Sequence, residues 1–243
     1  MFPGVGTVLN ISTILIGSTL GIFIGEKLKS RTRELITDIL GLVTILGAAS
    51  AIIPLFQGRY LNAMPKGWST MPILIALLLG GVIGSIFDLE TKVEHLGEYL
   101  RKKFKSKEGS FVEGFLDSSL LFAIGPLAIL GSISDGMGKG IDQLTLKSIL
   151  DGFASMAFAS SLGWGVAASA ISVGVYQGLW TLSGLALGNV LSDYQVDCMT
   201  ITGGLMLLGI GMRLLKIKNL PVGNLLPALF LAPLTALLFH QFI

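Results

Sequence analysis

Long apolar runs without charge are the feature that most constrains this chain. The first covers about residues 5–25 and contains no Asp, Glu, Lys or Arg. A helix needs about 20 apolar residues to cross the hydrocarbon core of a bilayer. Overall, 52% of the 243 residues are hydrophobic and 13% are charged, with a mean hydropathy of +0.78, whereas soluble domains are about 25% charged. The sequence therefore predicts an all-α integral membrane protein.

Eight such runs can be placed along the chain. The predicted spans are residues 5–25, 35–55, 71–87, 111–133, 144–162, 165–188, 198–215 and 225–242. The first lacks a basic n-region and an A-x-A-like cleavage site, so we expect a retained helix and not a signal peptide. Only Gly163, Trp164 and Gly165 are available to turn between the fifth and sixth runs. Seven spans are therefore the alternative to eight.

The basic residues indicate how these spans are oriented. If the N-terminus lies outside and the spans alternate, cytoplasmic segments carry 13 of the 17 Lys and Arg residues. The outer segments keep four basic residues: Arg59, Lys66, Lys139 and Lys147. The positive-inside rule expects such an asymmetry in a bacterial inner membrane. We therefore predict that both termini lie outside the cell membrane.

The cytoplasmic segment 88–110 is predicted to form an amphipathic helix followed by a basic loop. Helical spacing places five apolar residues on one face: Leu89, Val93, Leu96, Leu100 and Phe104. A basic cluster then lies next to the membrane: Arg101, Lys102, Lys103, Lys105 and Lys107. This cluster predicts contact with anionic lipid head groups, at about 1 kcal/mol per basic residue. The alternative is an ordinary connector whose lysines only fix the topology.

An offset of 163 residues suggests an internal repeat. It aligns Gly21 with Gly184, Gly25 with Gly188, Leu28 with Leu191, and Gly41-Leu42 with Gly204-Leu205. After a shorter loop, Pro65-x-Gly67 with Pro72 resembles Pro221-x-Gly223 with Pro227. Spans 1–3 and 6–8 would point in opposite directions, as in the inverted repeats of secondary transporters. The predicted organisation is one membrane domain with a first repeat (1–87), the cytoplasmic segment (88–110), a central helix pair (111–163) and a second repeat (164–243).

Ionisable residues within predicted spans are candidates for a solute path, because they are expensive in hydrocarbon. Asp151 opens the fifth predicted span, with Ser155 one turn further and Ser161 beyond it. A carboxylate followed by hydroxyls could line a cation or proton path. The alternative is an Asp that caps the helix at the outer interface. Asp117 lies about two turns into the fourth span, although Ser118 beside it suits an interface equally well.

Two amides and a proline complete the candidate path. Asn10 in the first span and Gln177 in the sixth could face each other across a pathway, or could make ordinary interhelical hydrogen bonds. Gly125-Pro126 lies within the fourth span, where proline should kink or break the helix. Such a break could expose backbone to a solute or could be structural only.

A glycine stripe on the first span has two interpretations. Gly17, Gly21 and Gly25 recur every four residues, which makes one face of the helix smooth. This face could pack against the protein's own helices, or it could form a contact in a homo-oligomer.

Other chemistry has little support in the sequence. Neither a G-x-x-x-x-G-K-[ST] phosphate loop nor an H-E-x-x-H metal motif occurs, and Cys198 is the single cysteine. The two histidines have no neighbours that suggest a metal site or a catalytic triad. We expect no cofactor, no enzymatic activity and no nucleic-acid partner.

Four motifs resemble a family of bacterial inner-membrane proteins catalogued as domain of unknown function 554. They are Gly125-Pro126-Leu127-Ala128-Ile129-Leu130-Gly131-Ser132, Lys147-Ser148-x-x-Asp151-Gly152, Tyr176-Gln177-Gly178 and Asn224-Leu225-Leu226-Pro227-Ala228. The resemblance covers essentially the whole chain and implies a multi-pass membrane protein, sometimes described as a transporter, without an assigned solute. Asp151-Gly152-Phe153-Ala154 is also faintly similar to the Asp-Ala-Phe-Ala motif of small manganese exporters, with Gly in place of Ala.

Two functions remain open at this level. The first is a secondary transporter or channel that moves a small ion or solute across the inner membrane. The second is a non-transporting membrane module for assembly or lipid binding. Mutual hydrogen bonding of the buried amides would favour the second.

Overall fold

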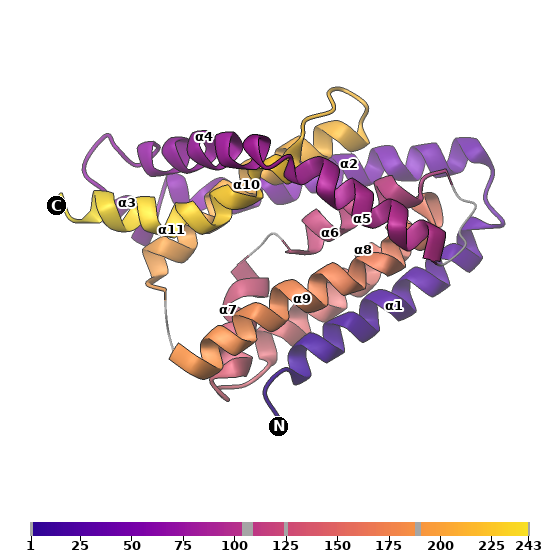
Figure 1. The fold of residues 1–243 in the computed structure, drawn as a ribbon, viewed down its shortest axis with the longest axis horizontal. Helices are drawn as coiled ribbons and strands as arrows, with labels where there is room; N and C mark the ends of the chain where they lie inside the picture. The colour runs from indigo at the N-terminus through magenta and orange to yellow at the C-terminus, as the bar shows by residue number, and fades with distance from the viewer. Residues whose placement is uncertain (1, 104–108, 124–125, 188–190, 243) are drawn as a thin grey trace. The chain divides into compact units, whose positions relative to one another are not determined.

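Helices are the only regular structure in the described part of the chain, which the computed structural model gives as residues 2–103, 109–123, 126–187 and 191–242 (Figure 1). The helices are α1 (Val5–Gly25), α2 (Ser30–Ile52), α3 (Arg59–Asn62), α4 (Met71–Ile86), α5 (Leu89–Lys103), α6 (Phe111–Ala123), α7 (Pro126–Gly136), α8 (Asp142–Leu162), α9 (Trp164–Leu187), α10 (Asp193–Leu214) and α11 (Leu226–His240), with 3-10 turns η1 (Ile53–Leu55) and η2 (Val222–Leu225). The predicted all-α class is confirmed, and within the described residues each predicted span lies mainly on helical residues.

Four described segments are long and apolar enough to cross a membrane: Val5–Gly25, Ser30–Asn62, Asp193–Leu214 and Val222–His240. The bent pairs α4–α5 and α6–α7 raise this number to six if each pair is one span. Helices α8 and α9 have 21 and 24 residues but are not among these candidates. Four to six spans therefore follow from length and composition within the described residues.

The helices belong to two compact units. Unit 1 comprises residues 1–40, 94–123 and 127–190, and unit 2 comprises residues 41–93, 124–126 and 191–243. Helices α1, α6, α8 and α9 lie in unit 1, together with nearly all of α7. Helices α3, α4, α10 and α11 lie in unit 2, and α2 and α5 each contribute to both.

Unit 1 is built on a close parallel pair, α1 and α8. Gly17 lies against Gly152, and Gly21 and Gly25 lie against residues 156 and 160, so residue numbers rise together on both helices. A Cβ at Gly21 would overlap the carbonyl oxygen of Met156. Only glycine permits this backbone approach, which is common between membrane helices. The glycine stripe therefore packs against a helix of the same chain, as the first of its two interpretations predicts.

Helix α9 runs antiparallel to α1 within unit 1. The hydroxyl oxygens of Thr7 and Thr181 lie 3.5 Å apart. A Cβ at Gly174 would lie 2.9 Å from Cδ1 of Ile11. The chain reaches α9 from α8 through Gly163, whose φ of 73° lies in the left-handed region that favours glycine. Helices α8 and α9 are therefore two separate helices, joined at the predicted turn.

The fourth predicted span is broken where proline was expected to interrupt it. Helix α6 ends at Ala123 and α7 begins at Pro126, with the two axes bent by 64°. Gly125 itself lies outside the described residues. Ser119 of α6 donates a hydrogen bond to Ser172 of α9 over 3.1 Å, so α6 is anchored on the first half of α9.

Unit 2 is built around α10 and α11, with α4 along α11 and the second half of α2 along α10. Glu90 forms a buried ion pair with Arg213, and its other carboxylate oxygen accepts the backbone N–H of Gly223. The Glu90 N–H donates to Oδ1 of Asn224 over 2.8 Å. This carboxylate therefore ties the start of α5 to the end of α10 and to η2.

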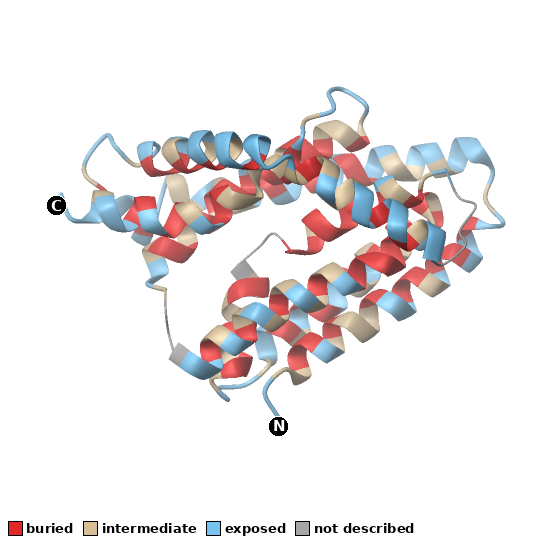
Figure 2. Cartoon of the chain, in the orientation of Figure 1, coloured by how far each residue is buried: buried red, intermediate tan, exposed pale blue. Residues whose placement is uncertain are grey.

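Burial follows the helix faces (Figure 2). On α4, Ile73 and Ala76 are buried, whereas Leu78 and Val82 are 60% and 57% exposed. Large exposed apolar residues on many helices are what a lipid-facing surface requires, and they would be unusual on a soluble protein.

Candidate functional site

Asp151 lies in the middle of α8. The helix begins at Asp142, about 14 Å before Asp151 at 1.5 Å per residue, and the Asp151 residue is only 7% exposed. The acidic residue in the first turn is Asp142. Asp151 is therefore a mid-helix carboxylate, and the alternative of a cap at the start of the helix does not hold.

Asp151 is neutralised by a lysine on the same helix. Nζ of Lys147 lies 2.6 Å from Oδ2 of Asp151, and the two side chains are 7% and 10% exposed. Oδ2 also accepts a hydrogen bond from Nδ2 of Asn10 on α1, over 3.0 Å. The structure thus joins two predicted path residues, Asn10 and Asp151, through one carboxylate oxygen.

The charge asymmetry of the sequence predicts Lys147 in an outer segment. It lies inside α8, one turn before Asp151, and is 6% exposed. An acid placed before a base at this spacing is the favourable order on a helix, and this pair has the opposite order. Burial explains the pair instead, because an isolated charge in a low-dielectric interior is very costly.

Gln177 of α9 faces α1. Gly174 and Thr181 lie three residues before it and four after it, so all three share one helix face. Gly174 contacts Ile11, and Thr181 contacts Thr7. The side chain of Gln177 is therefore level with residues 7–11 of α1, which include Asn10.

The Gln177 amide is unusual because it is fully buried and both of its polar atoms lack a hydrogen-bond partner in the described part of the chain. Its exposure is 0%, and neither Oε1 nor Nε2 has a partner among the described residues. Oδ1 of Asn10 is also buried without a partner there. An unsatisfied buried polar group costs about 1–3 kcal/mol. The two amides are thus at one level without bonding to each other, in contrast to what a simple packing role predicts.

We call Asn10, Lys147, Asp151 and Gln177 the amide–carboxylate site. It lies where α1, α8 and α9 come together in unit 1, about 14 Å from the start of α8 and 15 Å from the end of α9. Asn10 has one amide atom without a partner among the described residues, and Gln177 has two. Together with the charged pair, these atoms can bind a small polar or charged solute, because the protein itself does not use them.

A second polar group lies one turn away, toward the N-terminal end of α1. Oδ2 of Asp135 on α7 accepts the N–H of Gly6 over 2.9 Å, and Asp135 is 3% exposed. Helix α1 has no side-chain cap and no acidic residue in its first turn. Asp135 therefore supplies from another helix the negative charge that a helix N-terminus favours.

The two predicted serines do not extend the site. Ser155 is fully buried, donates to the carbonyl of Gly152 over 2.9 Å, and packs against Gly17. Ser161 bonds the backbone of Arg33 over 2.9 Å and the hydroxyl of Thr37. Both hydroxyls are thus used in packing α8 against α1 or α2.

Asp117 and the proline lie apart from Asp151 along the chain. Asp117 is fully buried in α6 and has an interaction within the protein. Ser119, two residues after Asp117 on α6, bonds Ser172 of α9. Ser172 lies more than one helical turn before Gln177, so Asp117 is not level with Gln177. Pro126 is the first residue of α7.

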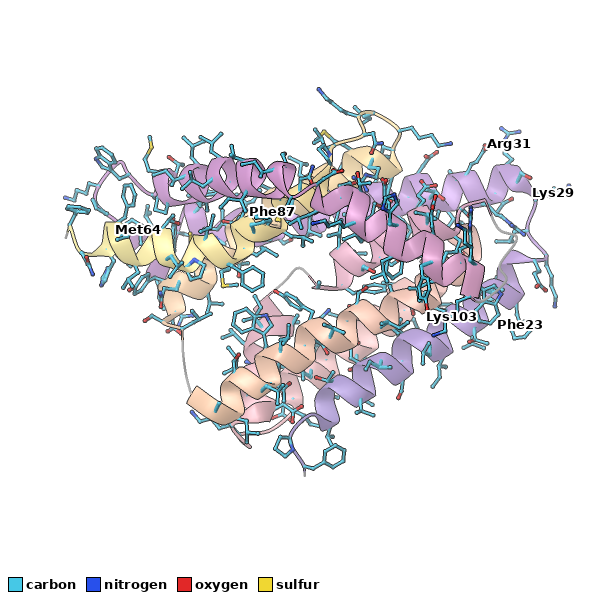
Figure 3. The ribbon with its side chains drawn as sticks, viewed as in Figure 1. Phe23, Lys29, Arg31, Met64, Phe87 and Lys103 are labelled. Atoms are coloured by element: carbon cyan, nitrogen blue, oxygen red, sulfur yellow. The ribbon has the colours of Figure 1, made fainter. Side chains whose placement is uncertain are left out.

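The basic cluster is described in part. Arg101, Lys102 and Lys103 form the last turn of α5, and Lys103 is labelled in Figure 3. Lys102 and Lys103 are exposed, whereas Lys105 and Lys107, like Phe104, lie outside the described residues. On the predicted apolar face, Leu100 is 6% exposed and Leu96 is 45% exposed. This face is therefore only partly covered by unit 1.

Sequence reasoning missed Lys147 and Asp135 as site residues. The spacing of Lys147 and Asp151, four residues apart, was a usable signal, because such residues lie on one helix face. Asp135 offered no comparable signal, since its contact with Gly6 joins residues 129 positions apart.

Two curated relatives match nearly the whole chain. The uncharacterized membrane protein YdfK of Bacillus subtilis (strain 168) is 27% identical over 237 residues, which cover 98% of this chain and 97% of the relative. The uncharacterized protein YqgA of Escherichia coli (strain K12) is 32% identical over 240 residues, or 96% of each chain. No solved structure matches.

The family comparison agrees with the motifs in the sequence. The family described as protein of unknown function DUF554 matches residues 5–237. The expected resemblance is confirmed, and the exposed apolar helices fit a membrane protein. The chain belongs to the DUF554 family of membrane proteins.

Proposed function

We propose that this protein is a secondary transporter or channel, and not an enzyme, that moves a small ion or solute across the bacterial inner membrane. The solute path passes through the amide–carboxylate site of unit 1. The observation that carries this proposal is the fully buried Gln177, whose two amide atoms have no partner among the described residues. A group that costs stability and lies level with Asn10, which donates a hydrogen bond to a buried ion pair, is typical of a binding site and not of a packing contact.

The proposed topology has eight spans with both termini outside. Helix α8 lies parallel to α1 from Gly6–Leu144 to Gly25–Ser160, so it extends over nearly the same depth as a segment that qualifies as a span. Helix α9 runs antiparallel to α1, as a sixth span should in an alternating chain. Lys29 lies in the connection between α1 and α2, and Arg31 lies in the first turn of α2. Both are labelled in Figure 3 and exposed, on the side that this topology assigns to the cytoplasm.

Reciprocal contacts support the inverted repeat. Gly41 lies against Leu215, with 2.8 Å from a Cβ at Gly41 to the leucine Cγ. Under the offset of 163 residues, Gly41 corresponds to Gly204 and Leu215 corresponds to Ile52. These two residues are also in contact, because a Cβ at Gly204 would lie 3.1 Å from Cγ1 of Ile52. Such an exchange is what a two-fold relation between α2 and α10 predicts, because each helix then contacts its equivalent in both directions.

The other equivalent helices pair in the same antiparallel way. Gly80 of α4 lies against Ala228 of α11, and Thr235 of α11 donates to the carbonyl of Pro72 of α4 over 2.9 Å. Ile11 and Gly174, which are equivalent under the same offset, contact each other at the crossing of α1 and α9. A local two-fold axis at this crossing would pass close to Asn10 and Gln177. Solute sites of inverted-repeat transporters typically lie where the repeats meet.

Solute flux into proteoliposomes tests the proposal. The full-length protein is reconstituted, and the influx of a panel of cations, anions and small neutral solutes is compared with that of empty vesicles. We expect one class to move faster than in empty vesicles, and we expect Asp151→Asn to lower that flux at least tenfold. The matched control is Asp142→Asn, which removes an exposed carboxylate from the first turn of the same helix and should leave the flux unchanged.

Two results would speak against these assignments. If no solute of the panel enters the proteoliposomes faster than it enters empty vesicles, the transport proposal should be abandoned. If Asp151→Asn and Asp142→Asn both retain wild-type flux, transport stands but the path does not depend on Asp151.

The alternative function is a lipid-binding or assembly module. The observation that favours it is the exposed pair Lys102 and Lys103 beside the partly exposed apolar face of α5. We propose that this end of α5 contacts anionic head groups whether or not the protein transports a solute. If solute flux is the same in proteoliposomes with and without anionic lipid, the lipid contact of α5 is not part of transport, and the two roles are separate.

A further inference from the structure

The buried charges of unit 1 bear on the class of solute. Asp135, Lys147 and Asp151 are 3%, 6% and 7% exposed, so in their ionised forms they carry two negative charges and one positive charge. The N-terminus of α1, which Asp135 contacts, offsets about half an elementary charge. The three side chains alone sum to one negative charge, which one monovalent cation balances. With the helix terminus counted, the excess before a cation binds is about half a negative charge.

Lys147 lies between the two carboxylates along α8. Asp151 is one turn after it. Leu144, one turn before Lys147, contacts Gly6. The backbone N–H of Gly6 donates a hydrogen bond to the carboxylate of Asp135. Asp135 is therefore level with Leu144, and a lysine side chain of four methylenes has a carboxylate on either side of it along the helix.

The order of this pair, with Lys147 before Asp151, is the less favourable one on a helix. The ammonium group of Lys147 lies 2.6 Å from the carboxylate of Asp151, and long side chains on helices prefer to point toward the N-terminus. A turn of the Lys147 side chain toward the N-terminus of α8 would bring its ammonium group toward the level of Asp135. The side chain can therefore leave Asp151 without becoming an isolated buried charge.

The remaining atoms around Asp151 suit a cation. Within the described residues, both hydrogen bonds to Asp151 reach Oδ2. The unpartnered Oδ1 of Asn10 and Oε1 of Gln177 lie at the same level of α1 and α9. One carboxylate with neutral amide oxygens offers the oxygen ligands that hard cations accept, and the charge of the cluster selects a monovalent one.

We infer that the solute is a small monovalent cation and that Lys147 is its internal competitor. The inference rests on the proposed function and deepens it. In the structure, the ammonium group of Lys147 is paired with the carboxylate of Asp151. A cation at Asp151, Asn10 and Gln177 displaces the ammonium group toward Asp135, so that two carboxylates face two positive charges. Asp117, the further buried carboxylate among the described residues of unit 1, has its own interaction, and we place it outside this exchange.

Thermal unfolding of the detergent-solubilised full chain tests this inference without measuring transport. The probes are Li⁺, Na⁺ and K⁺ chlorides, with N-methyl-D-glucamine chloride of equal ionic strength as the reference. In Lys147→Gln, Asp151 loses its competitor and its counter-charge, so at least one probe should raise Tm by about 5–10 °C at a concentration about 100 times Kd. The matched control is the double variant Lys147→Gln/Asp151→Asn, which has neither charge and should shift by less than about 2 °C.

The outcomes separate this inference from the proposed function. An equal rise in the single and double variants, or no rise in either, would overturn the inference. So would a Lys147→Gln protein that stays unfolded in all three salts while the double variant folds. If vesicles move an anion or neutral solute and Lys147→Gln shows no cation effect, transport stands and the cation is excluded. A cation effect without flux in vesicles would leave the binding site and remove transport.

Discussion

Replacement of Gln177 by methionine should stabilise the protein while impairing its function. Methionine has nearly the length of glutamine but no polar amide, so Gln177→Met removes two buried atoms that lack partners among the described residues. An unsatisfied buried group costs about 1–3 kcal/mol. For a chain of this size, 1 kcal/mol corresponds to about 2–4 °C in Tm. The expected rise in Tm is therefore about 2–12 °C.

Gln195 provides the matched control. It is also buried, at 8% exposed, but both ends of its side chain are used. Nε2 donates to the carbonyl of Pro233 over 3.1 Å, and Oε1 accepts the N–H of Ser192 over 2.9 Å. Gln195→Met leaves those two backbone groups unsatisfied, so Tm should fall by about 2–12 °C on the same reasoning.

Thermal unfolding of both variants in one detergent measures the difference, and solute flux is measured on the same preparations. The two substitutions are chemically identical, so their opposite signs isolate the effect of the hydrogen bonds. If Gln177→Met lowers Tm as much as Gln195→Met does, the amide of Gln177 is satisfied in the protein and the argument for a binding site fails. If Tm rises and flux is unchanged, Gln177 does not contact the solute.

Two further predictions concern the packing of the helices. Gly21→Ala places a Cβ against the carbonyl of Met156 and should lower the free energy of unfolding by about 1–3 kcal/mol. Gly47→Ala has no atom within 4 Å of the new Cβ and should be neutral or stabilising by up to about 1 kcal/mol. Thermal unfolding of both variants separates the effect of this contact from a general effect of replacing glycine, and equal shifts in Tm would contradict the close α1–α8 approach. Glu90→Gln removes the carboxylate that faces Arg213 and should cost about 3–5 kcal/mol; a change in Tm of less than 2 °C would show that this buried pair does not hold α5 to α10.

The helices were predictable because the signals that define them are local. An apolar run of about 20 residues identified α1, a glycine placed the turn between α8 and α9, and Pro126 identified the start of α7. Each depends on the conformational preferences of one or two neighbouring residues. The number of spans was less accessible, because the polar residues that give α8 its chemistry also lower its hydropathy.

The site was predictable only in part, because its geometry depends on helix pairing. Asp151, Asn10 and Gln177 were recognised as polar residues within apolar segments. The face that each presents depends on the register of α1 against α8 and α9, which local sequence does not encode. Lys147 was misassigned because charge counting treats every lysine near a span end as exposed, and its burial follows from a carboxylate on the next turn.

The parallel contact of α1 with α8 has a consequence for the order of assembly. Gly17 and its partner Gly152 are separated by about 135 residues of chain. At about 5–20 residues per second, the ribosome needs roughly 7–27 s to synthesise that stretch. During this interval α1 has been made, but the glycine face and the amide of Asn10 have no α8 to receive them. In the proposed topology, α1 therefore remains without this helix partner until α8 has been made.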